Sequence, residues 1–449
     1  MNKAVITLLF SAFGAAAQEP ISLQDAVRLA LGRNQSITAS GAAKKASESR
    51  ILEARSGLLP KVGYAESWTR SDNPVFVFGS LLTQHRFGAD NFQLGPLNRP
   101  DYLNNFQSQI AADQVLYEGG RTRHAIRSAE LNRDLTTEEG RRTQMDVIAG
   151  VIRAYYDSLL SADQLNATAQ AMRSVGADLV RAESVRDAGM ATDADVLSIR
   201  VHRAGVRERQ IRAQADVDVS RAALNDALGL PLDTPHQLTT QLAELDSTEN
   251  PLADQERTAI EQRPEARQAK LMTSLAETQA ATARSNLHPQ VILHAAFEAD
   301  RQQFVTKGGD NWTVSVGLHW NLFNGFADKA RIEESRFAVE RSTAEAARAG
   351  SAIRMQVRRA SADLHAATQR IEVARASVAE AEESLRITQN RYEAGFNNVS
   401  DLLRTETAVL ETRTRQLAAI RDQRIAAAMM ELASGTLRAD SDVVNERTR

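Results

Sequence analysis

The sequence predicts a mainly helical chain in which four β-strands are inserted as two pairs, and in which this arrangement occurs twice. Three observations lead to this prediction: where the prolines lie, where the aromatic residues lie, and an internal repeat. All ten prolines lie at or before Pro289, and none falls between Asp101 and Leu230. Because proline inside a helix costs about 3 kcal/mol, the two proline-free stretches permit very long helices.

Aromatic residues concentrate in two windows that carry the pattern of strands. Of the 22 aromatic residues, 15 fall in Pro60–Gly120 and His288–Phe326, including all three tryptophans. In the second window, apolar residues alternate with polar or small ones, which is the period of a strand with one apolar face. The apolar members are Trp312, Val314, Val316, Leu318 and Trp320. Each window is therefore predicted to hold a strand pair, although periodicity alone also fits an ordinary half-buried sheet.

An internal repeat fixes how these elements are arranged. Arg55–Val62 resembles Arg284–Val291, and this first match has a larger offset in numbering than the later ones. The later matches are Leu116–Gly119 with Leu322–Gly325 and Asp187–Gly189 with Glu393–Gly395, which share one smaller offset. The change of offset means that the first repeat has extra length, and it predicts a long loop at about Ser71–Leu103 within the first strand pair.

Each repeat is predicted to contain a helix, a strand pair, a very long helix and a shorter helix. In the first repeat, residues 18–227, the strand pair spans about 61–116 and the later helices about 119–188 and 191–227. In the second, residues 253–434, these elements span about 290–321, 325–394 and 397–434. Pro60 and Pro289 precede the two strand pairs. Residues 228–252 form a turn-rich segment between the repeats, and residues 435–449 a C-terminal tail.

Residues 1–17 have the pattern of a signal peptide for export. Lys3 supplies a positive start, Ala4–Phe13 is apolar, and Ala15–Ala17 provides small residues for cleavage. No later segment approaches the roughly 18–20 consecutive apolar residues of a spanning helix. The mature protein is therefore expected in the periplasm, outside the cell, or in the outer membrane as strands; a buried N-terminal helix is the alternative interpretation.

Composition argues against several classes of function. The 449 residues include no cysteine and carry a formal net charge of −3. The lack of cysteine excludes disulfides and thiolate chemistry, and the balanced charge argues against nucleic-acid binding. The nucleotide-binding, hydrolase and zinc-protease motifs are absent, and the eight histidines are scattered. We therefore expect no enzyme activity, no cofactor, no metal site and no nucleic-acid partner.

The long helix of the second repeat carries a heptad pattern, which predicts supercoiling against a neighbouring helix. Its apolar positions step by four and three: Ile353, Val357, Ala360, Leu364, Ala367, Ile371, Ala374, Val378, Ala381, Leu385, Thr388 and Tyr392. At ~1.5 Å per residue, the stretch from Gly325 to Ala394 would be about 105 Å long. Heptads alone fit a coiled-coil rod or periplasmic adaptor equally well, but such a protein does not explain the strands.

Four strands of about ten residues have the length to cross an outer membrane, but they cannot close a barrel. Since outer-membrane barrels need about eight strands or more, the missing wall must come from other copies of the chain. Two copies would give eight strands and three copies twelve. Only the larger number leaves a water-filled interior.

Taken together, the chain resembles the TolC-like outer membrane efflux protein family over nearly its whole mature length. The resembling segments are Ile21–Val27, Leu59-Pro60, His288-Pro289, Leu322–Gly325, Asn390–Gly395, Ser400–Leu403 and Arg186–Leu197. The resemblance implies a homotrimer that shares a twelve-stranded barrel in outer-membrane lipid, with coiled-coil helices forming a periplasmic tunnel. Residues 228–252 and the tail after Ser434 would form an equatorial belt.

The resemblance also implies a function. A family member of this kind is the passive outer channel of a tripartite efflux or type I secretion system, exporting small molecules or proteins. It docks onto a periplasmic adaptor, also called a membrane fusion protein, and through it onto an inner-membrane transporter. The competing class is a periplasmic coiled-coil adaptor or structural rod without a channel.

Family positions matching this sequence imply a gate at the periplasmic entrance. Gly189 and Gly395 would lie at the turns between helices, Asp401 in an acidic ring, and Asp195 beside Tyr392 in a contact that keeps the entrance closed. The alternative is that Asp195 and Asp401 simply stabilise helix N-termini.

The sequence departs from the family pattern at two entrance positions. Arg404 stands where the ring has a second acidic residue, and Asn397 where the family has a bonding arginine, with Ala194 opposite. We therefore expect fewer bonds at this entrance and a ring of mixed charge.

Overall fold

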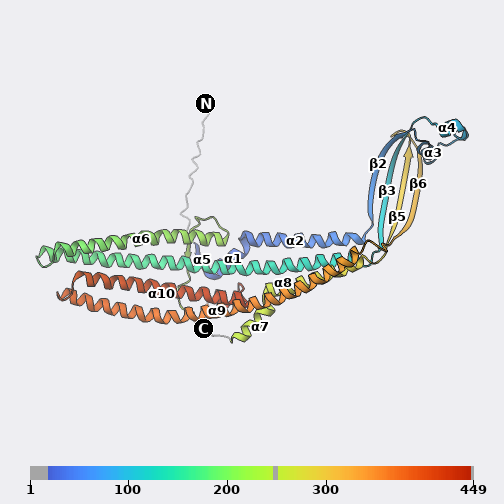
Figure 1. Ribbon diagram of the computed structural model, residues 1–449. Helices are drawn as coiled ribbons and strands as arrows, with labels where there is room; N and C mark the ends of the chain where they lie inside the picture. Colours follow the sequence, from blue (N-terminus) through green and yellow to red (C-terminus); the bar gives the residue numbers. More distant parts are fainter. Residues whose placement is uncertain (1–18, 246–250, 446–449) are drawn as a thin grey trace, which may run out of the picture. The chain divides into compact units, whose positions relative to one another are not determined.

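The computed structural model describes residues 19–245 and 251–445, so the expected signal peptide, residues 1–17, lies outside the described part of the chain. The described chain forms two compact units (Figure 1). The helical unit contains the described residues of Met1–Ala42, Glu138–Arg267 and Arg348–Arg449, and the strand unit contains Ala43–Thr137 and Gln268–Ala347. Each unit draws on both sequence repeats, so the repeats are not themselves the compact bodies.

The fold class is confirmed, because helices dominate and the strands occur as two pairs. The first repeat contains α1 (Leu23–Arg33), α2 (Gln35–Arg55), β2 (Lys61–Ser71), β3 (Leu103–Tyr117), α5 (Arg121–Asp187) and α6 (Asp193–Leu228). The second contains α7 (Leu252–Gln262), α8 (Pro264–Ser285), β5 (Gln290–Arg301), β6 (Gly309–His319), α9 (Ala327–Glu393) and α10 (Val399–Ser434). From the opening helix to the first strand of each pair, corresponding elements of the two repeats are separated in numbering by the larger offset. From the second strand onward, they are separated by the smaller offset.

The helix that opens each repeat is interrupted, whereas the sequence analysis expected one continuous helix. Asn34 ends α1 in an extended conformation, and its side-chain oxygen accepts a hydrogen bond from the Ser36 amide at 2.9 Å. In the second repeat Pro264 begins α8, where its missing N–H group is not needed. Local capping chemistry therefore produces two helices in place of one.

The strand unit contains one antiparallel sheet with the order β2-β3-β5-β6. The register places almost all large apolar side chains on one face: Val62, Tyr64, Trp68, Phe106, Ile110, Leu293, Phe297, Trp312, Val314, Val316 and Leu318. The opposite face is polar and includes Ser67, Thr69, Asn105, Gln107, Gln109, Asp113, His294, Glu298, Asp300, Asn311, Thr313 and Ser315. An ion pair between Glu66 and Arg301, at 3.0 Å, is an exception on the apolar face.

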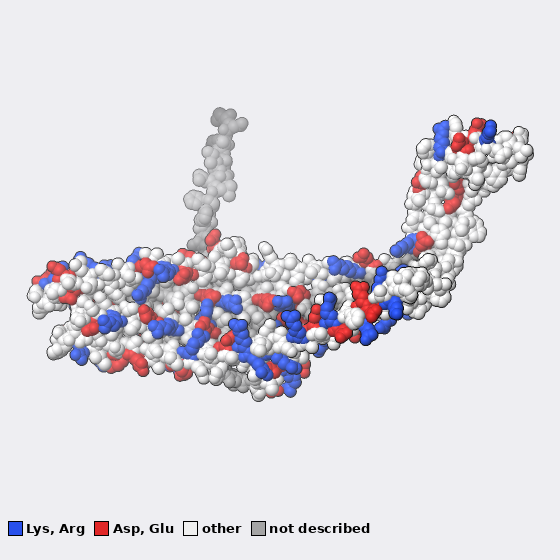
Figure 2. Space-filling view, in the orientation of Figure 1, with Lys and Arg blue, Asp and Glu red and all other residues white. Residues whose placement is uncertain are grey.

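The apolar face of this sheet is exposed, and both edge strands are open. Trp312 is 76% exposed, and its neighbours on the same face, Val314 and Val316, are also exposed. In the view of Figure 2, charged side chains crowd the helices but are sparse over the strands. Within the sheet, β2 and β6 each pair on one side only. An exposed apolar face and two open edges are both typical of a surface that another molecule covers.

The segment between β2 and β3 is structured, whereas the sequence analysis expected a loop. It contains α3 (Pro74–Thr83), a 3₁₀ turn (Ala89–Phe92) and α4 (Leu94–Asn98). The side chain of Asn73 accepts hydrogen bonds from the amides of Val75 and Phe76, and Pro74 occupies the first turn. An Asn-Pro pair that suggested a loop is therefore the start of a helix.

The helical unit has its largest core where α1, α5, α6 and α10 meet. Val151, Ile152 and Tyr155 of α5 are fully buried there, and the Tyr155 hydroxyl donates to the carbonyl oxygen of Ile21 at 2.9 Å. The short strands β1 (Glu19–Ile21) and β4 (His236–Leu238) pair in parallel. Part of the C-terminal tail joins this core as α11 (Asp442–Asn445), whose Val443 and Val444 are buried, while residues 446–449 lie outside the described part.

Among the described residues, none of the helices has a stretch that is long and apolar enough to cross a membrane. The very long helix α9 instead buries a narrow stripe, whereas α5 buries a broader face that includes Val151, Ile152, Tyr155 and Tyr156. In α9 the buried members include Ile353, Val357, Ala367 and Ile371, which follow the predicted heptad positions. This spacing is typical of helices packed as coiled coils.

Candidate functional site

Two turns of the same geometry reverse the chain at one end of the helical unit. At the end of α5, the Gly189 amide donates to the Arg186 carbonyl at 2.8 Å and the Met190 amide to the Val185 carbonyl at 3.0 Å. The end of α9 has the equivalent bonds at Gly395 (3.0 Å) and Phe396 (2.8 Å). Both glycines have φ of +78°, a left-handed conformation that favours glycine. We call this region the paired turns.

The aspartates that follow the paired turns, Asp195 and Asp401, lie in the first turns of α6 and α10. The carboxylate of Asp195 accepts hydrogen bonds from the amide and hydroxyl of Thr192, at 3.1 and 2.8 Å, and the Asp195 amide donates back to the Thr192 hydroxyl. The amide of Asp401 donates to the side-chain oxygen of Asn398 at 2.9 Å. Negative charge is stabilised at such positions by unpaired amides and the helix dipole.

Asp401 is also paired with the residue that departs from the family pattern. The Arg404 guanidinium lies 3.5 Å from the Asp401 carboxylate, one turn along α10, and its side chain is largely exposed. Asn397 lies half-buried in the turn just before the Asn398 cap. Each chain therefore presents an acid–base pair at this turn rather than an unpaired acid.

If Asp401 lines a channel entrance, Arg404→Ser is expected to make that entrance more cation-selective. Removal of the guanidinium leaves the Asp401 charge unpaired, and an exposed charge of this kind changes ion energies by roughly 1 kcal/mol, or about fivefold in permeability. Reversal potentials in a salt gradient measure the ratio of cation to anion permeability. An unchanged ratio for Arg404→Ser, with Arg415→Ser as the control, would place Asp401 away from the ion path.

Tyr392 packs between the two helix pairs rather than forming a hydrogen-bonded lock with Asp195. It lies against an apolar cluster that includes Val175, Leu179 and Val196. Burial raises the pKa of the Tyr392 phenol, and the nearby Asp195 charge adds to the effect. Among the described residues, no hydrogen bond joins Tyr392 to Asp195, and the role of this pair in keeping the entrance closed stays a prediction.

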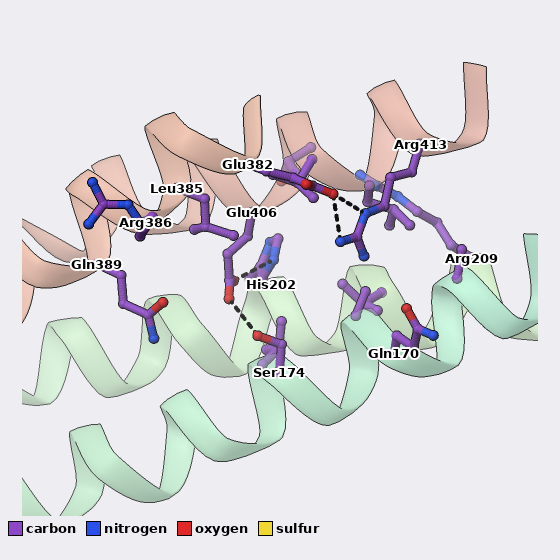
Figure 3. Close-up of a pocket in the computed structure, with 17 residues that line it drawn as sticks. Gln170, Ser174, His202, Arg209, Glu382, Leu385, Arg386, Gln389, Glu406 and Arg413 are labelled. Atoms are coloured by element: carbon purple, nitrogen blue, oxygen red, sulfur yellow. Dashed lines mark hydrogen bonds and ion pairs between the residues drawn. The ribbon is translucent and has the colours of Figure 1, made fainter. Parts of the chain in front are cut away.

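A buried polar cluster links the α5–α6 pair to the α9–α10 pair (Figure 3). Glu406 of α10, whose side chain is only 9% exposed, accepts a hydrogen bond from the Ser174 hydroxyl of α5 at 3.2 Å. Its other carboxylate oxygen lies 3.5 Å from Nε2 of His202 on α6. Asp178 of α5 also acts electrostatically on this carboxyl group. We call Glu406, Ser174, His202 and Asp178 the Glu406 cluster.

The Glu406 cluster borders a cavity of about 370 Å³ between the four helices. Apolar side chains, including Leu385 and Leu410, line part of it. The charged residues around it are Arg209 of α6, Arg386 and Glu382 of α9, and Arg413 of α10, which pairs with Glu382 at 2.7 Å. A second link between the pairs, from Arg181 of α5 to Glu393 of α9, lies closer to the turns.

Burial sets the protonation of the Glu406 cluster. It raises the pKa of Glu406 to about 8, and the adjacent Asp178 contributes to that rise, while the Ser174 hydrogen bond opposes the change. Burial also lowers the pKa of His202, with Arg209 adding to the effect and Asp178 opposing it. At neutral pH, Glu406 is therefore mostly protonated, so its burial between the helix pairs does not leave a full negative charge unpaired.

The sequence analysis did not single out the Glu406 cluster, although a signal for it exists. In α10 the buried positions Leu402 and Val409 are spaced so that Glu406 falls on the same stripe. A carboxylate within an apolar heptad stripe indicates a buried acid that needs a partner. The partners could not be read from the sequence, because they lie on two helices of the other repeat.

The remaining predicted positions lie in the strand unit and are structural. Pro60 immediately precedes β2, and Pro289 immediately precedes β5. In the part of the chain that the structure describes, no group of three or more His, Asp and Glu side chains is arranged to hold a metal ion.

Comparisons with known proteins show the family to which the chain is similar. The family model for outer membrane efflux proteins matches residues 26–230 and 257–436. Protein CyaE of Bordetella pertussis is 27% identical over 345 residues, covering 75% of this chain and 72% of that protein. Outer membrane efflux protein BepC of Brucella suis is 22% identical over 372 residues, covering 82% and 80%.

The fold is also that of a solved outer membrane channel. The crystal structure of CmeC from Campylobacter jejuni matches with a TM-score of 0.79 at 14% identity, over 94% of this chain and 88% of that one. The likeness covers both the strand pairs and the long helices, because it spans nearly the whole chain.

Proposed function

Because the chain belongs to the outer membrane efflux protein family, we propose that it is the passive outer duct of a tripartite exporter. Three copies would share one twelve-stranded barrel in the outer membrane, and their long helices would prolong the pore into the periplasm. The fold and the family are those of channel proteins. Since a duct of this kind performs no chemistry, we propose no catalytic role for any residue.

The observation that carries this proposal is the four-stranded sheet with one exposed apolar face and two open edges. An apolar face suits lipid, and the polar face suits a water-filled lumen. The open edges of β2 and β6 satisfy their backbone groups only if neighbouring copies pair with them, because unpaired edges do not occur in hydrocarbon. Four strands from each of three copies then close a wall with an aqueous interior.

A periplasmic adaptor or structural rod, the alternative, accounts less well for this sheet. Such a protein would expose Trp312, Val314 and Val316 to water with nothing to cover them. The paired turns suit the channel instead. They expose Met190 and Phe396 at the end of the helical unit, where a periplasmic adaptor connected to an inner-membrane transporter could dock.

The direct test is to purify the mature protein in detergent, determine its mass, and reconstitute it in a planar bilayer. We expect a particle with three times the mass of the protomer, recovered from the outer membrane fraction, and discrete conductance steps. A monomer that is soluble without detergent and does not conduct would contradict the proposal and support the rod.

A further inference from the structure

The charge-free helix α3, at the connected ends of β2 and β3, presents an apolar stripe that is partly exposed at Phe78 and Leu82 and largely exposed at Val75. Val75 is 82% exposed, and Phe78 and Leu82 of the same helix are also exposed. Their spacing of three and four positions places them on one face, as in helices that pack against other helices. The opposite side of α3 is buried at Val77 and Ser80.

The segment containing α3 is a folded structure that is fixed in place. Phe87 packs edge-on against Phe78 and Phe92, with ring centroids 4.7 and 5.0 Å apart. Arg86 hydrogen-bonds to Gln302 in the loop of the other hairpin. The exposed stripe is therefore held on a defined surface and does not belong to an unstructured loop.

A buried polar network fastens the end of α3 to one particular face of the sheet. Gln84, which is fully buried, donates to the side-chain oxygen of Asn105 at 2.8 Å, and Asn105 donates to Asp300 at 2.6 Å. Asn311 donates to the Thr83 carbonyl oxygen at 3.3 Å. The register places Asn105, Asp300 and Asn311 on the polar face. The segment therefore covers the outer end of the face that would line the lumen.

This attachment also brings α3 to the open edge of the sheet. Asn311 belongs to β6, which pairs only with β5 and would pair with the next copy in a shared barrel. The apolar stripe thus continues the surface on which copies would meet. Threefold symmetry would bring three such helices into one water-filled mouth, where the equivalent stripes of the other copies offer apolar contact.

We infer that the α3 helices of the three copies pack against one another through Val75, Phe78 and Leu82 and constrict the outer mouth of the channel. This inference rests on the proposed function, because it needs the shared barrel. The occupant of the apolar stripe is the same helix of a neighbouring copy. The connection from Ser71 to Leu103 provides the length to reach it, since it is several times longer than the connection from Arg301 to Gly309.

The lack of cysteine in the native sequence makes the test specific. We expect Val75→Cys trimers to form disulfide-linked dimers on mild oxidation, and their single-channel conductance to rise on reduction. Val305→Cys is the matched control, since Val305 is a 91% exposed valine in the other hairpin loop, and it should not cross-link. Val75→Asp should raise conductance at least twofold, and Val305→Asp should leave it unchanged.

Two results would overturn the inference while leaving the channel intact. One is a conducting trimer in which Val75→Cys fails to cross-link and Val75→Asp conducts like the native protein. The other is quenching of a bimane probe on Val75→Cys by brominated lipid, which would place α3 in the membrane. A monomer that does not conduct would instead refute the channel itself.

Discussion

Val314→Lys is expected to prevent the chain from assembling in the outer membrane. Val314 lies at the middle of β6 on the apolar face, where it pairs with Ala295. A lysine facing lipid near the middle of the bilayer costs about 2–4 kcal/mol in a membrane barrel, and a trimer would bear that cost three times. We expect at least a tenfold loss of assembled protein, measured by membrane fractionation and by the trimer band in detergent.

The neighbouring residue provides a matched control. Ser315 adjoins Val314 in the same strand but lies on the polar face, opposite His294. Ser315→Lys adds the same charge at the next position and should assemble normally, with only its ion selectivity changed. Equal assembly of the two variants would mean that the apolar face does not contact lipid. The main argument for a shared membrane barrel would then fail.

The periodic parts of the fold could be predicted from the sequence. The long helices begin and end close to the predicted limits, because the Gly-containing turns, the lack of proline and the heptad stripes all indicate the same boundaries. The strands were recognisable because a sheet with one apolar and one polar face must alternate apolar and polar residues. Repetition strengthened both patterns, since each signal occurs twice in the same order.

Features that depend on pairing across the fold were not predictable. The pair of Arg404 with Asp401 is local, since the two residues are three positions apart on α10, and its spacing could have been read from the sequence. The α3 segment looked like a loop because Asn73-Pro74 is typical of turns as well as helix starts. The Glu406 cluster joins α10 to α5 and α6 of the other repeat, which are distant from it in sequence, so its partners follow from packing alone.

The Glu406 cluster leads to the second major prediction, that alkaline pH favours separation of the two helix pairs. Glu406 has a pKa raised to about 8 when buried, against 4.5 when it is exposed. The packed state therefore binds more protons between these values, and its stability falls as pH rises through that window. From pH 6.5 to 8 the expected loss is about 1–2 kcal/mol for each copy, or roughly tenfold in the opening equilibrium.

His202 acts in the opposite direction, but at lower pH. Its pKa is lowered in the folded chain, so its contribution to stability is lost as pH falls below its ordinary value of 6.5. The window above pH 6.5 therefore reports mainly on Glu406. Arg209, Arg386 and Arg413 also line the cavity, and Arg209 adds to the lowering of the pKa of His202.

Glu406→Gln is the decisive variant, because glutamine resembles the protonated carboxyl group and cannot ionise. We expect the leak conductance of the native channel to rise about tenfold between pH 6.5 and 8, and that of Glu406→Gln to stay nearly constant. Glu411→Gln, which changes an exposed carboxylate on the same helix, should retain the native response. If Glu406→Gln kept the native pH dependence, ionisation of Glu406 would not be what separates the helix pairs, and the link from Arg181 to Glu393 would become the leading candidate for the closing contact.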